Sequence, residues 1–186
     1  MKHRDPKIQH FLDLRVKRKP QLEKNIPSIW NYNTVLYIGA RTDRIDFGDE
    51  FKENNYKMDI LEIFKPNVDY LKKIEWLNQI IEGDVKEVDK IIDKKYDVIF
   101  WWHGPEHIGK EDLKVTLDKL KKLANHYVVL GCPWGDVEQG DIFGNKWEEH
   151  VSELNLEDFE ENGFKTDLIG EKDILGSNIL AWWKNE

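Results

Sequence analysis

Short apolar runs, rich in β-branched and aromatic residues, recur along the first two thirds of the chain. They lie at 34–39, 58–64, 79–82, 97–101 and 127–131. The runs are continuous and do not alternate with polar residues, which is typical of strands that are buried on both faces of a parallel sheet. We therefore predict five strands at these positions.

The segments between these runs predict helices. The clearest is 110–125, in which Leu113, Leu117, Leu120 and Leu123 recur at helical spacing. Shorter helices are expected at 46–54, 88–92 and 156–162, and another begins at Pro66 with Val68, Leu71 and Ile74 facing inward. Before the first strand, two helical pieces at 10–16 and 21–25 are expected to be separated by Pro20.

The last third of the chain has a different pattern. Residues 134–154 predict a long irregular segment, and such segments in compact domains are usually functional or mobile. Two strand-like runs at 164–169 and 178–183 then follow each other without a helix between them, which predicts an antiparallel pair. The whole pattern predicts an α/β, Rossmann-like three-layer sandwich, with a seven-stranded, mostly parallel sheet whose last strand is antiparallel.

Composition limits the class of protein and the cellular setting that we expect. The chain has 186 residues, of which 40% are hydrophobic and 34% are charged, as expected of one globular unit. No apolar run approaches the roughly 20 residues of a membrane span, so we expect no membrane partner. The one cysteine, Cys132, cannot form an intrachain disulfide, and a reducing, cytoplasmic setting is expected.

Charge is distributed unevenly along the chain. The net charge of -8 argues against a nucleic-acid partner, because phosphate binding favours a basic surface. Residues 1–24 carry eight basic and three acidic side chains, a net of +5, so the remainder carries -13. This basic start is compatible with contact to an anionic substrate or RNA. We favour instead a solvated N-terminal helical arm that spans residues 1–33 and is followed by a single domain that spans residues 34–186.

Candidate binding residues lie where the predicted strands end, the edge at which parallel sheets bind ligands. Gly39 ends the first strand and is followed by Ala40 and Arg41, and Glu62 lies 23 residues after Gly39. That spacing is close to the roughly 20 residues typical of an acid that binds ribose hydroxyls. Gly83 and Asp84 end the third strand, and Asp84 lies 22 residues after Glu62.

From residue 34 to residue 183 the chain resembles the class I S-adenosylmethionine-dependent methyltransferases. The resemblance implies S-adenosylmethionine as cofactor and a small molecule as substrate. It implies cofactor contacts from Gly39, Ala40, Arg41, Glu62, Ile63, Phe64, Asp84, Val85, Trp101 and Trp102. Glu62 would bind the ribose, and Asp84 with the amide of Val85 would bind the adenine. The first motif departs from the family pattern, because Tyr37 replaces its acidic residue and only Gly39 remains of its glycines.

The stretch from Asp97 to Ile108, which includes the fourth strand and the loop after it, resembles the fourth motif of the family. Trp101 and Trp102 lie where the family contacts the methionine part of the cofactor. Adjacent side chains on a strand point to opposite faces, so we expect only one of the two to line the site. His103, Glu106 and His107 resemble the metal-binding spacing of a family branch that makes ubiquinone, although a glutamate is usual where this chain has His103. A structural or proton-handling role for the Glu-His pair is the alternative.

His107 and His150 are the candidate catalytic bases. Many small-molecule methyltransferases of this class place a histidine between the fifth strand and the next helix, as His150 is placed here. Imidazole titrates near neutral pH and is suited to removing a proton from a nucleophile. The alternative for His150 is a surface histidine on a mobile loop.

Three functions are therefore considered. The leading one is a methyltransferase that acts on a small molecule. The second is a non-catalytic Rossmann-like binding module whose cofactor site has degenerated. The third is a metal-dependent or metal-binding protein centred on His103, Glu106 and His107, with His150 as a further ligand. A homodimer is left open by the sequence.

Overall fold

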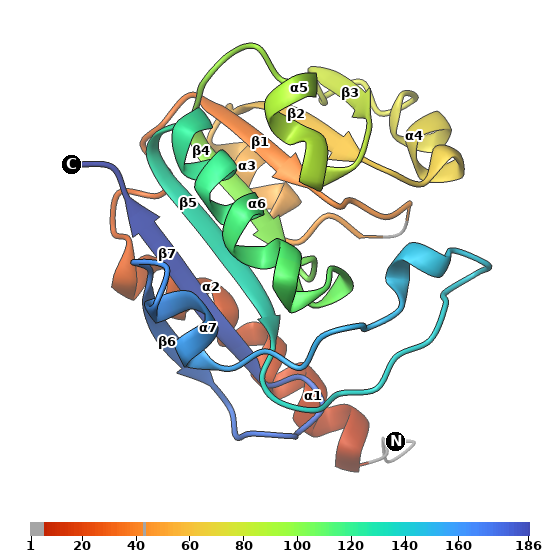
Figure 1. The fold of residues 1–186 in the computed structure, drawn as a ribbon, viewed down its shortest axis with the longest axis vertical. Helices are drawn as coiled ribbons and strands as arrows, with labels where there is room; N and C mark the ends of the chain where they lie inside the picture. Colours follow the sequence, from red (N-terminus) through yellow and green to blue (C-terminus); the bar gives the residue numbers. More distant parts are fainter. Residues whose placement is uncertain (1–5, 43) are drawn as a thin grey trace.

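A computed structural model describes residues 6–42 and 44–186, so the first five residues of the predicted arm lie outside the described part. Seven strands form one sheet in the order β3-β2-β1-β4-β5-β7-β6 (Figure 1). Their bounds are β1 (Thr34–Ile38), β2 (Lys57–Glu62), β3 (Gln79–Glu82), β4 (Tyr96–Trp102), β5 (Ala124–Pro133), β6 (Lys165–Ile169) and β7 (Asn178–Lys184). The sheet contains all seven strands that the sequence predicts.

The register confirms the predicted mixture of parallel and antiparallel pairs. β1 pairs in parallel with both β2 and β4, and β4 pairs in parallel with β5. β7 is inserted antiparallel between β5 and β6, with Leu130 opposite Ala181 and Leu168 opposite Ile179. The carboxyl ends of the five parallel strands β1 to β5 therefore lie along one edge of the sheet.

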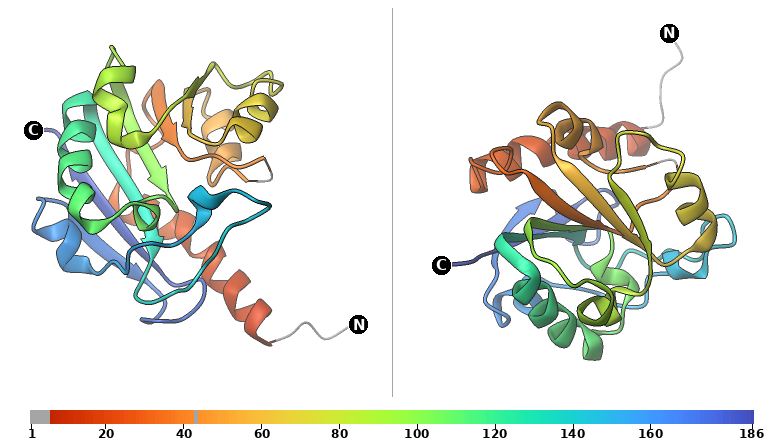
Figure 2. Two further views of the ribbon diagram at one scale, coloured as in Figure 1. Left: turned by 45° about the vertical axis from the view of Figure 1, so that its right-hand side comes forward. Right: turned by 90° about the horizontal axis from the view of Figure 1, so that it is seen from above.

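Helices cover both faces of the sheet and bury a separate apolar layer on each (Figure 2). One face packs against α5 (Val88–Ile91), α6 (Lys110–Leu123) and α7 (Leu156–Glu160). The other packs against α2 (Arg18–Asn25), α3 (Gly48–Glu53) and α4 (Lys65–Leu71). Among residues 6–42 and 44–186, no helix combines the length and the apolar composition needed to cross a membrane.

The N-terminal helices differ from the prediction at Pro20. α1 (Pro6–Val16) and α2 are separated at Lys17, and Pro20 lies within the first turn of α2. Proline is tolerated there because the first amides of a helix have no intrahelical acceptor. Leu14, Leu22 and Ile26 are buried, so both helices contribute apolar side chains to the interior of the molecule.

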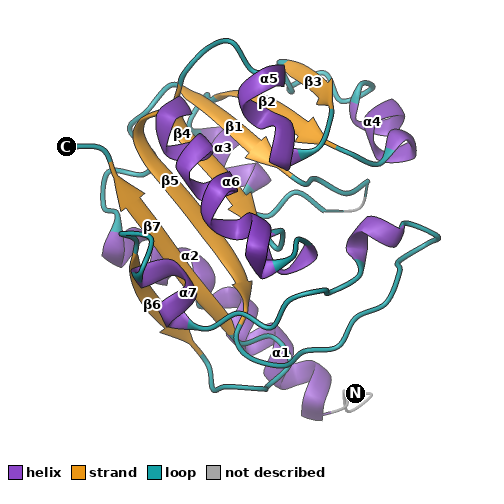
Figure 3. Ribbon diagram, in the orientation of Figure 1, coloured by secondary structure: helices purple, strands orange, loops and turns teal. Residues whose placement is uncertain are grey.

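Figure 3 shows where the helices, strands and loops lie in the fold. Several of these elements begin or end a few residues away from the predicted bounds. β2 ends at Glu62, so Phe64 lies outside the strand and is the N-cap residue of α4. α4 ends at Leu71, and Ile74 therefore packs from the following turn. α6 ends at Leu123 because Ala124 already pairs with Tyr96 in the sheet, which places Asn125 in β5. The irregular segment 134–154 contains only a short 3-10 turn, Lys146–Glu148, which is labelled η3.

Candidate active site

Two cavities lie side by side at the carboxyl ends of the parallel strands. The first, here called the Glu62 cavity, has a volume of about 160 Å³ and is lined by the ends of β1, β2 and β4 and the turn after β3. The second, here called the Arg18 cavity, has a volume of about 360 Å³ and is bordered also by α1, α2 and the segment 134–154. Gly39, His103, His107 and Glu148 line both cavities, so the two share one wall.

Glu62 is buried at the end of β2, with 4% of its surface exposed. Its carboxylate lines the Glu62 cavity and accepts a hydrogen bond of 2.7 Å from the backbone amide of Phe64. Burial raises the pKa of Glu62 to about 7, and the nearby charge of Glu148 acts in the same direction. The neighbouring strand ends in register at Glu82, which is exposed. Glu62 is therefore a buried acceptor that faces a cavity.

The turn after β1 presents its backbone to the same cavity. Gly39 has a φ of +75°, a left-handed conformation that a residue with a side chain rarely adopts, and no atom lies within 4 Å of the position of a Cβ. Ile63, Asp84 and Val85 also line the cavity, and Asp84 accepts a hydrogen bond of 2.9 Å from the amide of Lys86. Residues at the ends of β1, β2 and β3 thus line the same cavity.

Four predicted cofactor residues, namely Ala40, Arg41, Phe64 and Trp102, do not line the Glu62 cavity. Ala40 is buried in the apolar layer that packs against α2 and α3, and it does not line the Glu62 cavity. Arg41 lines the Arg18 cavity, where its Nη1 lies 3.7 Å from Oε2 of Glu148. Phe64 lines a neighbouring hollow next to Pro66.

Trp101 and Trp102 point to opposite faces of the sheet, as alternation along a strand requires. Trp101 lines the Glu62 cavity, and Trp102 lines the Arg18 cavity. A Cβ on Gly131 of the neighbouring strand would lie 2.4 Å from the Trp102 ring, so glycine is needed for that ring to fit. Each tryptophan therefore borders a different cavity.

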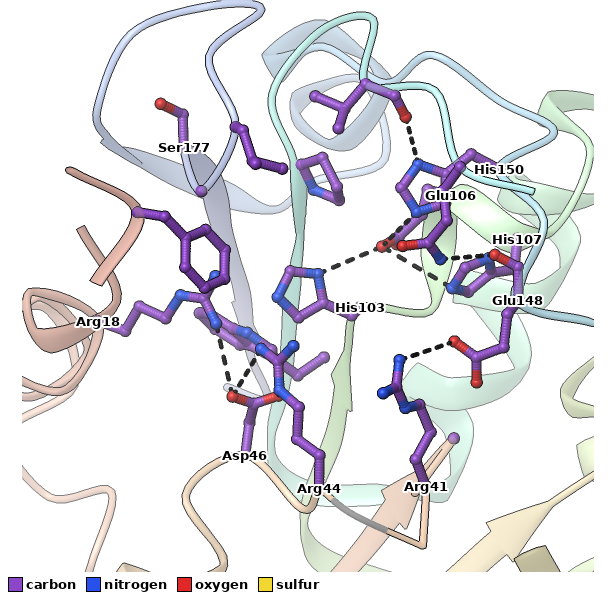
Figure 4. A pocket seen from close by; sticks show the side chains of 18 of the residues that line it. Arg18, Arg41, Arg44, Asp46, His103, Glu106, His107, Glu148, His150 and Ser177 are labelled. Atoms are coloured by element: carbon purple, nitrogen blue, oxygen red, sulfur yellow. Dashed lines mark hydrogen bonds and ion pairs between the residues drawn. The ribbon is translucent and has the colours of Figure 1, made fainter. Parts of the chain in front are cut away.

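Glu106 lies at the centre of a cluster of three histidines (Figure 4). Its Oε1 lies 3.4 Å from Nδ1 of His103, 4.0 Å from Nε2 of His107 and 3.9 Å from Nε2 of His150. Glu106 is 2% exposed, and neither carboxylate oxygen has a hydrogen-bond partner. The structure thus brings together all four of the titratable residues that the sequence singles out near the predicted site.

Backbone carbonyls determine the tautomers of two of these histidines. Nδ1 of His107 lies 3.0 Å from the carbonyl oxygen of Glu149, and Nδ1 of His150 bonds to the carbonyl oxygen of Val137. A carbonyl only accepts hydrogen bonds, so each Nδ1 carries the proton and each Nε2 keeps a lone pair directed toward Glu106.

Burial keeps the charged forms of this cluster unfavourable. It raises the pKa of Glu106 to about 8 and lowers the pKa of His107 to about 4. Burial also lowers the pKa values of His103 and His150, and for His103 the charges of Arg18 and Arg44 act in the same direction. At neutral pH the histidines are therefore neutral, and the protonated form of Glu106 predominates.

The backbone at His103 is strained. Its φ of 52° is uncommon for a residue other than glycine, and its amide donates a 2.7 Å hydrogen bond to the carbonyl of Gly131. This turn directs the chain from β4 into the loop that carries Glu106. Strained backbone of this kind is often found at functional sites.

Sequence reasoning missed a group of charged residues in the Arg18 cavity. Asp46 lies within ion-pair distance of Arg18 at 3.5 Å, Arg44 at 2.6 Å and Arg15 at 3.8 Å. Arg18 is 3% exposed, so the expectation that the basic N-terminal residues are solvated is wrong for this side chain. The density of basic residues in 1–24 was the available signal, but it did not indicate which of them is buried.

Comparison with known proteins identifies the fold. No protein family model matches the chain, and no curated protein matches it in sequence. Magnesium protoporphyrin IX methyltransferase from Synechocystis PCC 6803, solved with bound SAM, is similar with a TM-score of 0.63 and 10% identity, over 96% of this chain and 81% of that chain.

Two further solved structures are similar over almost their whole length. A SAM-dependent methyltransferase from Archaeoglobus fulgidus has a TM-score of 0.60 and 17% identity, over 97% of this chain and 100% of that chain. The N-methyltransferase NodS from Bradyrhizobium japonicum WM9 has a TM-score of 0.62 and 12% identity, over 93% of this chain and 97% of that chain. The chain has the fold of the class I SAM-dependent methyltransferases, as the resemblance in its motifs implies.

Proposed function

We propose that the chain is an S-adenosylmethionine-dependent methyltransferase that acts on a small molecule. The observation that carries this proposal is the pair of adjoining cavities at the strand ends, which share Gly39, His103 and His107. Methyl transfer requires a cofactor and an acceptor to be held next to each other with water excluded. The Glu62 cavity suits the cofactor and the Arg18 cavity suits the acceptor.

The residues of the Glu62 cavity fit S-adenosylmethionine. A buried carboxylate at Glu62 accepts hydrogen bonds from ribose hydroxyls, and the open backbone at Gly39 admits close approach of the cofactor. Asp84 and the amide of Val85 lie where the adenine edge would be held, and the Trp101 ring offers an aromatic face to a sulfonium. When bound, the cofactor supplies a methyl group that is already activated for transfer.

The chain itself orients the acceptor and accepts its proton. His107 and His150 line the Arg18 cavity, and the Nε2 atom of each carries a lone pair. His150 is the better base, because burial lowers the pKa of His107 to about 4. The proton of a hydroxyl or amine nucleophile is therefore assigned to Nε2 of His150.

Calorimetric titration with S-adenosylmethionine and S-adenosylhomocysteine tests the cofactor. We expect micromolar binding by the wild type and at least tenfold weaker binding by Glu62→Ala. Glu82→Ala is the matched control, because Glu82 ends the adjacent strand in register but is exposed. If the folded wild type binds neither compound, the non-catalytic module becomes the better interpretation.

The Glu106 cluster favours metal binding as a second candidate function. Glu106, His107 and His150 each offer a ligand atom, and these atoms lie within 4.8 Å of one another. The Nδ1 atoms of both histidines bond to carbonyls, an arrangement that commonly orients histidine ligands of metals. His103 adds Nδ1 as a fourth nitrogen or oxygen donor near Glu106. This set of donors suits zinc, manganese or iron(II).

Metal analysis of protein purified without a histidine tag tests this candidate. If metal binding is the function of the cluster, the wild type contains stoichiometric zinc or manganese and His150→Ala loses it. His10→Ala is the control, because His10 is exposed on α1 and lies outside the cluster. Equal metal content in both variants, or none in wild type incubated with each metal, would exclude this site.

A further inference from the structure

The Arg18 cavity contains buried hydrogen-bond donors that methyl transfer does not explain. Arg18 lies on α2 and lines the cavity, with Nη1 3.5 Å from Oδ1 of Asp46. Its Nε and Nη2 are buried and have no hydrogen-bond partner. Nε1 of Trp102, which lines the same cavity, is also buried without a partner. Buried donors without acceptors are rare in native proteins and usually indicate a missing partner.

The unpaired groups of Arg18 and Trp102 are all donors, whereas the unpaired carboxylate oxygens of Glu106 lie on the other side of His103 (Figure 4). Nε and Nη2 form one edge of a planar guanidinium, the edge that donates two parallel hydrogen bonds to a carboxylate or phosphate. The Arg18 guanidinium lies 5.8 Å from the centre of the Trp102 ring, so the indole N–H lies in the same part of the cavity. An oxyanion satisfies all three donors, whereas a neutral amide or hydroxyl does not provide enough acceptor oxygens.

The charges of this cluster also favour an anion. Among the described residues, Arg18 and Arg44 line the cavity and lie within ion-pair distance of the Asp46 carboxylate, so that two positive charges face one negative charge there. The chain as a whole has a net charge of -8. An excess of positive charge inside an acidic protein attracts a negatively charged ligand to this place.

The remaining walls of the cavity indicate the rest of the ligand. They include five apolar residues, namely Ile8, Phe11, Pro133, Val137 and Leu175. The volume of about 360 Å³ lies within the range of roughly 300–1,000 Å³ that is usual for small-molecule sites. A small compound with an apolar or aromatic body fits this lining.

We propose that the Arg18 cavity binds the carboxylate or phosphate group of a small, partly apolar methyl acceptor through Arg18 and Trp102. The acceptor role rests on the proposed function, whereas the anion site itself does not. Figure 4 shows His103 between the arginines and Glu106, so the cavity holds an anion on one side and presents the lone pairs of His107 and His150 on the other. The reacting hydroxyl or amine therefore points toward Glu106, away from Arg18.

Calorimetry with benzoate and phenyl phosphate tests the anion site, with benzamide as the neutral probe of similar shape. We expect one of the two anions to bind the wild type at least tenfold more tightly than benzamide does. Whether that anion is benzoate or phenyl phosphate shows whether the site prefers a carboxylate or a phosphate. Arg18→Met should weaken that binding at least tenfold. Arg15→Met is the control, because Arg15 contacts the same Asp46 but is 45% exposed and does not line the cavity.

A second variant keeps the test informative if Arg18→Met unfolds. Trp102→Phe removes the indole N–H and keeps an aromatic ring, and it should weaken the anion several-fold. S-adenosylhomocysteine is titrated into the same samples. Anion binding without S-adenosylhomocysteine binding would refute the methyltransferase and leave the anion site standing. If S-adenosylhomocysteine binds and benzamide binds as tightly as the two anions, the anion site is refuted and the methyltransferase proposal is not.

Discussion

Glu62 is the residue whose protonation state most directly affects the proposed function. Burial raises its pKa to about 7, with a further increase from Glu148 and opposing hydrogen bonds from Asn67 and the amides of Ile63 and Phe64. The carboxylate offers its full acceptor capacity to ribose hydroxyls only when it is ionised. We therefore expect the proposed cofactor binding to depend on pH in the physiological range.

We therefore expect the affinity for S-adenosylhomocysteine to rise about tenfold between pH 6 and pH 8. With a pKa of about 7, the ionised fraction of Glu62 rises from about one tenth to about nine tenths over this interval. Calorimetric titration at four pH values measures the effect. Glu62→Gln should bind weakly with no such slope, and an equal slope in that variant would show that another group titrates.

Asp46 neutralises a buried arginine, so its removal should destabilise the fold. Arg18 is 3% exposed and Asp46 is 9% exposed. Breaking a buried ion pair by removing one partner typically costs about 3–5 kcal/mol, because the other charge stays buried. We expect Asp46→Asn to lower the free energy of unfolding in urea by about 3 kcal/mol. The control Glu53→Gln, at an exposed position of α3, should change it by less than about 0.5 kcal/mol.

At the scale of elements, short apolar runs predicted every strand of the sheet. The Glu62 and Asp84 positions followed from spacing along the chain, since parallel strands of similar length bring their ends together. The convergence of His150 on Glu106 was not predictable in this way. It depends on a 44-residue separation and on an irregular segment whose backbone bonds to the Glu106 carbonyl through Val151 and Ser152.

Helix α1 forms a wall of the Arg18 cavity through Ile8 and Phe11, and it contributes no residue to the Glu62 cavity. Deletion of residues 1–16 should therefore abolish binding of the anionic probe and leave the Kd for S-adenosylhomocysteine within twofold of wild type. Calorimetry measures both, and circular dichroism confirms that the shortened chain is folded. Parallel loss of both ligands by a folded protein would contradict the separation of the two cavities.

The η3 turn lines the Glu62 cavity with Trp147, which is 43% exposed. The volume of about 160 Å³ is small for a ligand site, so we expect the segment that carries Trp147 to move if the proposed cofactor binds there. We expect Trp147→Ala to change the Kd for S-adenosylhomocysteine by at least threefold, as measured by calorimetry. Val151→Ala, at an exposed position of the same segment, should leave it unchanged.

At the scale of the whole molecule, both proposed sites lie at one edge of the sheet, and each of the two helical layers packs near a different site. The layer containing α5 and α6 packs behind Trp101 and the Glu62 cavity, and the layer containing α2 packs behind Trp102 and the Arg18 cavity. The division of the chain at residue 33 stays a prediction. The burial of Leu22 and Arg18 shows that α2 belongs to the interior of the molecule.

The antiparallel insertion of β7 also bears on how the chain folds as it is synthesised. β5 and β6 are not paired with each other, and each is joined to the sheet through β7. Until the segment 178–184 leaves the ribosome, β5 has an open edge and β6 has no neighbour, and open edges invite pairing between chains. A nascent chain that stalls before residue 178 should therefore depend on chaperones, even though its first five strands are complete.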